Sequence, residues 1–303
     1  MNRASDPMRV LVTGGTGFIG QALLESIPPH WTVIATTRRD APVPAGVESV
    51  RFPTGHETLE PTLAEGFDVL IHLAGNSNHG MAEREPWADL EATAHTGAVV
   101  VGRVPARRIV LLSSAAVYAG LVGRVSPASC VRPPMAYALS KLYVEGLVQS
   151  RVASHAAESG VVIRLYNAFG PGERPTRLIP RVAEAVAAGA EFVLSGDPES
   201  LSDPVHVDDV VQALIGAAES TVSGTFDLCG GDPLPLRNQL DRIAAAIGGR
   251  LEGVRVQPRE GEVPIAFHSD VRPICAALGI PHPEPFESAV RRYARSAGWQ
   301  GST

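Results

Sequence analysis

Thr13-Gly14-Gly15-Thr16-Gly17-Phe18-Ile19-Gly20 follows directly on the apolar run Val10-Leu11-Val12 near the start of the chain. This order predicts a strand, a tight glycine turn and the first turn of a helix, which is the setting of a dinucleotide-binding fingerprint. Gly14 lets the chain turn, Gly17 lets the backbone approach a pyrophosphate, and Gly20 lets the helix pack closely on the strand. A bare glycine pattern is also typical of an ordinary tight turn, but the flanking strand and helix favour dinucleotide binding.

The residues that follow the second predicted strand indicate which dinucleotide binds. This strand is the β-branched run at residues 32–36. An NAD site carries a carboxylate about 20 residues after the glycine turn, where it binds the ribose 2′-hydroxyl. Arg38 stands at that place, and an arginine would pair with a 2′-phosphate. We therefore predict NADP, with NAD as a possible cofactor; the alternative is that Arg38 and Arg39 are surface residues that close a strand. The predicted cofactor-binding residues are Gly14, Thr16, Gly17, Phe18, Ile19, Gly20, Arg38, Leu73, Ala74, Gly75, Tyr137 and Lys141.

Composition limits the other classes of partner and site. The net charge of −6 and the absence of a long basic run argue against a nucleic-acid partner. No apolar stretch reaches the roughly 18 residues of a membrane span, and the first nine residues lack the apolar centre of a secretory signal. Cys130, Cys229 and Cys275 are widely spaced, so neither disulfides nor a metal site is expected. We expect a cytoplasmic protein.

The alternation of apolar strands with helices predicts the fold. Up to Tyr166 the expected strands are short and nearly all apolar, which predicts an α/β fold with a doubly wound parallel sheet of the Rossmann type. One expected helix runs from Tyr137 to about Ser159. The later part mixes short elements with many prolines and is predicted to be a smaller C-terminal α/β substrate domain. The predicted NADP-binding domain is 8–166, with a returning segment near 203–220, and the substrate-binding domain is 167–202 with 221–303.

Tyr137 and Lys141 are the candidate catalytic pair. They lie one helical turn apart and therefore on one helix face. A lysine ammonium favours the tyrosine phenolate, so Lys141 is expected to lower the pKa of Tyr137 toward the working range. Ser114, at the end of a predicted central strand, would hydrogen-bond the reacting oxygen. Tyr-x-x-x-Lys is common on exposed helices, but its order after the fingerprint and the Ser113-Ser114 strand end favours catalysis.

The motifs in this order resemble those of the extended short-chain dehydrogenases/reductases, in the branch of nucleotide-sugar epimerases, dehydratases and reductases. The matching stretches are Thr13–Gly20, His72–Gly75, Ser113–Tyr118, Tyr137–Lys141, Arg164–Pro171 and His206–Asp209. The resemblance implies catalytic roles for Ser114, Tyr137 and Lys141 and places Asn167 at the substrate. It also implies a homodimer whose interface is formed by the helices at 87–103 and 137–159.

Departures from the family pattern narrow the expected activity. Ala115 and Ala116 stand where family dehydratases carry an Asp-Glu pair, and alanine cannot transfer protons, so dehydration is not expected. Ser202 replaces an arginine that contacts the diphosphate in many nucleotide-sugar enzymes, and Ala94 replaces a typical asparagine. Arg177 is the candidate replacement for the diphosphate contact, together with its neighbours Arg174 and Arg181. His206 and Asp209 are expected to brace the second domain.

These observations lead to one hypothesis and two alternatives. The hypothesis is an NADPH-dependent oxidoreductase that reduces a keto group of a nucleotide-linked sugar or a similar small molecule, with Tyr137 as proton donor. The predicted substrate-binding residues are Ser114, Asn167 and Arg177. A nucleotide-sugar C4 epimerase that retains NAD needs the same three catalytic residues. A non-catalytic NADP-binding regulator is the other alternative, although such proteins often lose the tyrosine or the lysine that this chain keeps.

Overall fold

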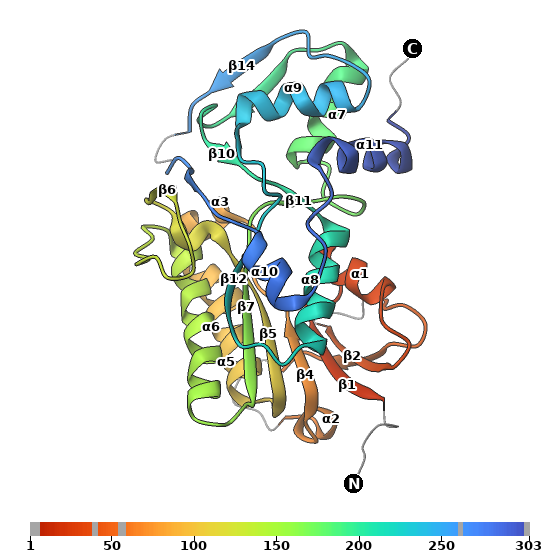
Figure 1. The fold of residues 1–303 in the computed structure, drawn as a ribbon, viewed down its shortest axis with the longest axis vertical. Helices are drawn as coiled ribbons and strands as arrows, with labels where there is room; N and C mark the ends of the chain where they lie inside the picture. Colours follow the sequence, from red (N-terminus) through yellow and green to blue (C-terminus); the bar gives the residue numbers. More distant parts are fainter. Residues whose placement is uncertain (1–6, 38–41, 54–58, 260–262, 300–303) are drawn as a thin grey trace.

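Seven parallel strands form the central sheet of the protein. The computed structural model describes residues 7–37, 42–53, 59–259 and 263–299, and in it the strands have the spatial order β12-β7-β5-β4-β1-β2-β3 (Figure 1). Their bounds are β1 Met8–Thr13, β2 Trp31–Thr37, β3 Glu48–Arg51, β4 Phe67–His72, β5 Ala106–Ser114, β7 Ser159–Leu165 and β12 Gly224–Leu228. The inner strands consist almost entirely of buried residues, as a parallel sheet covered on both faces requires. The predicted Rossmann-type fold is confirmed.

Helices cover both faces of this sheet. Alternate residues of each strand point to opposite faces, so Val10 and Val12 join one apolar core and Leu11 joins the other. The first core includes residues of α1 (Phe18–Glu25), α8 (Val207–Glu219) and α10 (Arg272–Leu278). The second includes residues of α2 (Pro61–Ala64), α5 (Thr96–Arg103) and α6 (Ala136–Ala153). Figure 1 shows the sheet between these two layers.

A smaller part with its own core lies at the carboxyl end of the sheet strands (Figure 1). Its helices are α7 Leu178–Ala188, α9 Leu236–Ala246 and α11 Phe286–Ala297. Three short strand pairs accompany them: β9 Phe192–Ser195 with β14 Val254–Gln257, β10 Leu201–Ser202 with β13 Leu234–Pro235, and β8 Ala168–Phe169 with β11 Val205–His206. A fourth pair, β6 Val122–Arg124 with β15 Ala266–His268, lies apart from these helices, and Phe267 of β15 packs in a separate small core with Val117 and Tyr118. No helix among the described residues is both long and apolar enough to cross a lipid bilayer.

The structure differs from the sequence interpretation at two boundaries. The helix expected to reach Ser159 ends at Ala153, because a turn follows in which His155 has a positive φ of 58°, and Ser159 already begins β7. Residues 224–228 pair with β7 as an edge strand of the central sheet, and α10 packs into the first core. Both segments lie within 221–303, which the sequence predicts to belong to the substrate-binding domain. The division into a cofactor-binding and a substrate-binding domain otherwise stays a prediction.

The expected helix over 87–103 is present, but it is not uniform. It consists of α4 (Pro86–Asp89), a π-helical stretch at Leu90–His95, and α5. The π-helical stretch places Thr93 and Ala94 against the inside of the fold, where both are buried. Such wide turns are rare in helices and often occur at functional sites. The remaining short elements are α3 (His79–Arg84) and a 3₁₀ turn at Ala115–Tyr118.

Candidate active site

The predicted functional segments meet at one edge of the sheet. Because the strands are parallel and in register, their carboxyl ends lie side by side: Thr13 of β1 is level with His72 of β4, and Ser114 of β5 is level with Leu165 of β7. The glycine turn follows β1, and Ala74 and Gly75 follow β4. In open α/β sheets this edge is where ligands bind.

The glycine turn leaves little room for side chains. Gly14 has a φ of +75°, and a Cβ built on it would lie 2.7 Å from the backbone nitrogen of Ala74. Gly20 is packed against the backbone of Gly14 and Gly15, so a Cβ there would overlap with main-chain atoms. Gly17 precedes α1 and has no side chain to cap the first N–H groups of the helix, which are therefore available to a phosphate. These features fit a bound dinucleotide.

Of the other predicted cofactor contacts, four lie at the ends of β1 and β4 or at the start of α1, and one lies outside the described residues. Thr16, Phe18 and Ile19 lie in the turn and the start of α1, and Leu73 follows β4 with its N–H bonded to the carbonyl of Thr13 at 3.1 Å. Arg38, on which the preference for NADP rests, lies outside the described residues.

Tyr137 is buried and remains protonated at neutral pH in this structure. It is the second residue of α6 and is 6% exposed. Burial raises the pKa of Tyr137 above its ordinary value of 10, while a hydrogen bond with the Ser114 side chain and the charge of Arg177 lower it. The Lys141 ammonium lies 5.9 Å from the centre of the phenol ring. The expectation that Lys141 brings the pKa of Tyr137 down is therefore not met, because burial outweighs the favourable charges.

Lys141 reaches the same place from the next turn of α6. It is 6% exposed, and its Nζ donates to the carbonyl of Leu112 at 3.4 Å. A Cβ on Gly75 would lie 3.3 Å from this Nζ, so the glycine after β4 is what lets the lysine approach. Burial lowers the pKa of Lys141 to about 8, and the carboxylates of Asp89 and Glu145 oppose this shift.

Lys141 is also the sole lysine of the chain. Every other cation among the 26 lysines and arginines is an arginine. A guanidinium stays charged and does not release its proton, whereas a buried ammonium shifts its pKa readily. The one lysine of the chain is therefore a buried residue of the candidate site.

Ser114 lies at the end of β5, beside Tyr137. Its Oγ accepts a hydrogen bond from the backbone N–H of Ala116 at 3.2 Å, which leaves its hydroxyl hydrogen free to point to another oxygen. Asn167 follows β7 and is exposed, with its carbonyl accepting from Val205 at 2.8 Å. Arg177 is exposed and immediately precedes α7; its charge acts on Tyr137, so it lies near the candidate proton donor.

Two residues of the site were missed by sequence reasoning. The ring centroids of His79 and Tyr137 lie 4.3 Å apart, and the ring planes are inclined by 37°. Asp89 is fully buried, and its charge acts on His79, Tyr137 and Lys141. Neither residue belongs to a sequence motif: His79 lies in the polar segment 76–84, and Asp89 lies in the helix expected over 87–103.

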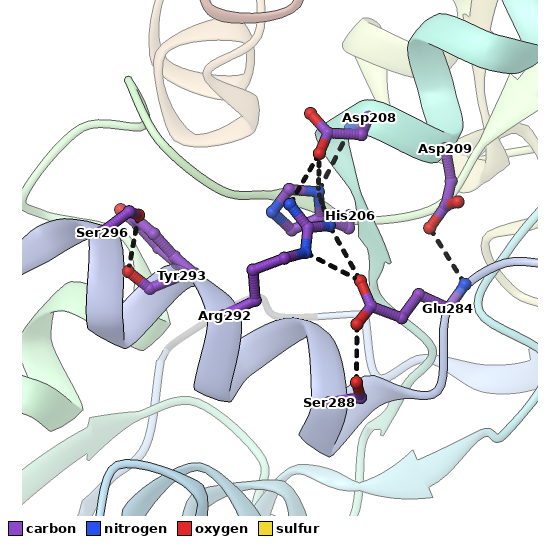
Figure 2. A network of polar contacts seen from close by, with 8 residues as sticks. All are labelled: His206, Asp208, Asp209, Glu284, Ser288, Arg292, Tyr293 and Ser296. Carbon is purple, nitrogen blue, oxygen red and sulfur yellow. Dashed lines mark hydrogen bonds and ion pairs between the residues drawn. The ribbon is translucent and has the colours of Figure 1, made fainter.

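His206 and Asp209 join the two parts of the molecule, as the sequence suggested. Figure 2 shows Arg292 of α11 beside His206, with Asp208 and Glu284 on either side. Arg292 donates to Asp208 at 2.7 Å and to Glu284 at 2.8 Å, and its Nη2 lies 3.1 Å from Nδ1 of His206. Asp209 accepts from the backbone N–H of Glu284 at 3.1 Å. These contacts hold the N-terminal end of α8 against α11.

Comparisons with known proteins agree with this geometry. Residues 10–228 match the model of the NAD dependent epimerase/dehydratase family. The chain is 27% identical over 285 residues to a UDP-glucose 4-epimerase from Corynebacterium glutamicum, covering 85% of both chains. It is 28% identical over 267 residues to a 2′-dehydrokanamycin reductase from Streptomyces kanamyceticus, covering 83% of this chain and 70% of the relative. Among solved structures, MoeE5 in complex with UDP-glucose and NAD superposes with a TM-score of 0.83 at 27% identity, covering 95% of this chain and 99% of MoeE5.

Proposed function

The chain belongs to the NAD dependent epimerase/dehydratase family, and from this membership we propose that it is an NADPH-dependent reductase of a keto group on a nucleotide-linked sugar or a similar small molecule. The observation that carries the proposal is the state of Tyr137. Its hydroxyl is hydrogen-bonded with Ser114 and is protonated at neutral pH, because burial raises its pKa further above the ordinary value of 10. A protonated tyrosine can donate, which is the direction that carbonyl reduction requires.

The chain's own residues perform the proton chemistry in this mechanism. NADPH, when bound, supplies a hydride to the carbonyl carbon. The Ser114 hydroxyl donates a hydrogen bond to the carbonyl oxygen and holds it beside Tyr137. Tyr137 then gives its proton to that oxygen as negative charge develops there, and the nearby ammonium of Lys141 stabilises the phenolate that remains. Lys141 and Gly75 would contact the ribose of the cofactor, and the Gly14–Gly20 turn would hold the pyrophosphate.

The substrate class is proposed from the relatives and from two exposed polar residues, Asn167 and Arg177. The solved structure of MoeE5 contains UDP-glucose, and a relative is named as a 2′-dehydrokanamycin reductase, so both sugar nucleotides and keto sugars occur among similar proteins. Arg177 is exposed and its charge acts on the candidate proton donor, and Asn167 is exposed after the end of β7, whose Leu165 is level with Ser114. We propose that Asn167 contacts the sugar and that Arg177 binds the diphosphate.

An NAD-retaining nucleotide-sugar C4 epimerase is the second candidate. The relative from Corynebacterium glutamicum carries that activity in its name, and MoeE5 was solved with NAD. Such an enzyme needs a tyrosine that first accepts and then returns a proton, and Ser114, Tyr137 and Lys141 are sufficient for it. The cofactor preference separates the two candidates, since a reductase consumes NADPH from solution and this epimerase keeps its NAD.

A fluorescence titration of cofactor-stripped protein with NADPH and with NADH tests the proposal. A charge-assisted pair between Arg38 and the 2′-phosphate stabilises by about 1.5–3 kcal/mol, so NADPH is expected to bind roughly ten-fold more tightly or better. Arg38→Ala is expected to abolish the preference, whereas Arg84→Ala, on the exposed end of α3, leaves it intact. Equal binding by wild type, or NAD that co-purifies with the protein, would make the epimerase the leading candidate.

We also propose that the protein forms a homodimer through α6 and the helical segment beside it. Large apolar side chains are exposed on both: Trp87 and Leu90 on the segment, Leu139 and Tyr143 on α6. Leu139 and Tyr143 are four residues apart and therefore share one face. Such exposed apolar groups mark interaction surfaces when they are contiguous.

Leu139→Glu is expected to convert the dimer to a monomer, because it places a charge in the proposed interface. Sedimentation velocity measures the change, and Val254→Glu, at an exposed position of β14, is the matched control that should stay dimeric. A wild-type protein that sediments as a monomer at micromolar concentration would contradict the proposal.

A further inference from the structure

His79 covers the ring of the candidate proton donor. It is the first residue of α3, and its imidazole lies 4.3 Å from the phenol ring of Tyr137, centre to centre. His79 itself is exposed, whereas Tyr137 is almost completely buried. The imidazole therefore stands between the tyrosine and the solvent. The contact joins two segments that are far apart in the sequence.

A hydrogen-bonded loop holds His79 in this place. The buried carboxylate of Asp89 accepts from Nδ2 of Asn76 at 2.8 Å, and the backbone N–H of Asn76 donates to Thr93 at 2.9 Å. The Asn76 side chain accepts from the N–H of Asn78 at 2.8 Å, and the Asn78 side chain in turn accepts from the N–H of Met81 at 3.0 Å. Asn78 is thus the N-cap of α3, and the helix starts at a position fixed by the buried Asp89.

The other end of α3 is fixed to the catalytic helix. Oε1 of Glu83 accepts from the backbone N–H of Ala136 at 2.9 Å, and Ala136 is the first residue of α6. A carboxylate at a helix N-terminus interacts favourably with the free N–H groups there. The short helix therefore contacts α6 at two adjacent points, the backbone of Ala136 and the ring of Tyr137.

We propose that His79 is a positioning residue for Tyr137, which holds the phenol ring beside Ser114 and keeps water from it. The inference rests on the proposed function, in which Tyr137 donates the proton. Holding a reacting group in place is a large part of catalysis, and a displacement of about 1 Å can lower a rate by roughly 100-fold.

Burial, with the positive charges nearby, keeps the ring of His79 neutral. Partial burial against Tyr137 lowers the pKa of His79, the positive charges of Arg177 and Lys141 lower it further, and Asp89 raises it. An uncharged imidazole can lie against the phenol without adding another cation to a place that already holds Lys141 and Arg177. The stacking contact is therefore between two uncharged rings at neutral pH.

The ionisation of Tyr137 tests the proposal without any substrate. Tyrosinate has its own near-ultraviolet absorbance, and the chain has five tyrosines. Burial raises the pKa of Tyr118, Tyr166 and Tyr293 far above 10, so these three contribute little to an alkaline titration. Subtracting the titration of Tyr137→Phe from that of each variant removes the remaining background and isolates Tyr137. Circular dichroism over the same pH range shows where the fold persists.

His79→Ala is expected to shift the Tyr137 midpoint to lower pH, because water then reaches the phenol and solvates its anion. His79→Phe keeps a stacked ring and is expected to keep the wild-type midpoint, as is His282→Ala, which removes an exposed histidine elsewhere. NADPH affinity should stay within about two-fold in all three, since none removes a proposed cofactor contact. An unchanged midpoint in His79→Ala, or an equal shift in His79→Phe, would overturn the proposal. Failure of the reductase assignment would leave this readout unaffected.

Discussion

Tyr137→Phe is expected to lower turnover of a keto substrate by about 100- to 10,000-fold, the range that a positioned acid–base group contributes. The phenol hydroxyl is the proposed proton donor, and phenylalanine removes that atom alone. The phenylalanine ring occupies the same buried space beneath His79, so packing at the start of α6 is retained. NADPH affinity should therefore change little, because the proposed cofactor contacts of the glycine turn, Gly75 and Lys141 remain.

Oxidation of NADPH by a panel of sugar-nucleotide ketones measures the change. Tyr143→Phe is the matched control, because it makes the same chemical change at an exposed position of the same helix and keeps the apolar ring that the proposed dimer interface uses. The sole lysine offers a direct check that the site is intact: selective labelling of lysine gives a single side-chain signal, expected to titrate near pH 8 in wild type. Turnover that survives in Tyr137→Phe would remove this residue from the mechanism.

The sheet was predictable from the sequence because its strands are buried on both faces. β1, β4, β5 and β7 are apolar runs, and runs of this kind separated by helices have few alternatives to a parallel sheet. β12 was not predicted to belong to it. It is an edge strand of five residues in which only Asp227 and Leu228 are fully buried, so nothing in its sequence identifies β7 as its partner.

The site was predictable where its residues belong to local patterns. The turn from Gly14 to Gly20 and the pair Tyr137 and Lys141 are each contained in one element, and Ser114 ends a strand. His79 and Asp89 act through tertiary contacts, with Tyr137 and Asn76 respectively, that no periodicity encodes. The raised pKa of Tyr137 could also not be predicted from the sequence, because it depends on burial by segments distant in the sequence.

A buried charged network lies directly behind the catalytic residues. Glu145 is one helical turn after Lys141, and it pairs with Arg164 of β7, with Nη2 and Oε2 2.7 Å apart. Ser113, the residue before Ser114, donates to Glu145, and Arg164 donates to the hydroxyl of Tyr118 at 3.0 Å. Both charged side chains are buried, with exposures of 6% for Arg164 and 3% for Glu145. The network therefore joins α6, β5 and β7 at the level of the site.

Glu145→Ala is expected to lower the free energy of unfolding by about 3–5 kcal/mol, because it leaves the Arg164 guanidinium buried without its main counter-charge. The hydroxyl of Tyr118 and the more distant Asp227 remain near Arg164. Burial raises the pKa of Asp227 to about 6, so at pH 8 this carboxylate is ionised and offsets part of the loss. At pH 8 the loss in the free energy of unfolding is therefore expected to lie in the lower half of this range. Urea denaturation followed by circular dichroism measures it.

A double replacement separates the net contribution of the ion pair to stability from the penalty of leaving one buried charge unpaired. Glu145→Leu with Arg164→Met removes both buried charges and fills similar space, and replacing a buried ion pair in this way is often neutral or stabilising. The double variant is therefore expected to be more stable than Glu145→Ala, although Tyr118 and Ser113 each lose a partner. Glu158→Gln breaks the exposed pair with Arg107 and is the control that should show no measurable change. A double variant as unstable as Glu145→Ala would contradict this expectation. It would mean that the lost hydrogen bonds of Ser113 and Tyr118, rather than the uncompensated charge, dominate the destabilisation. The network would then stabilise the protein mainly through its polar contacts with the strand end that carries Ser114.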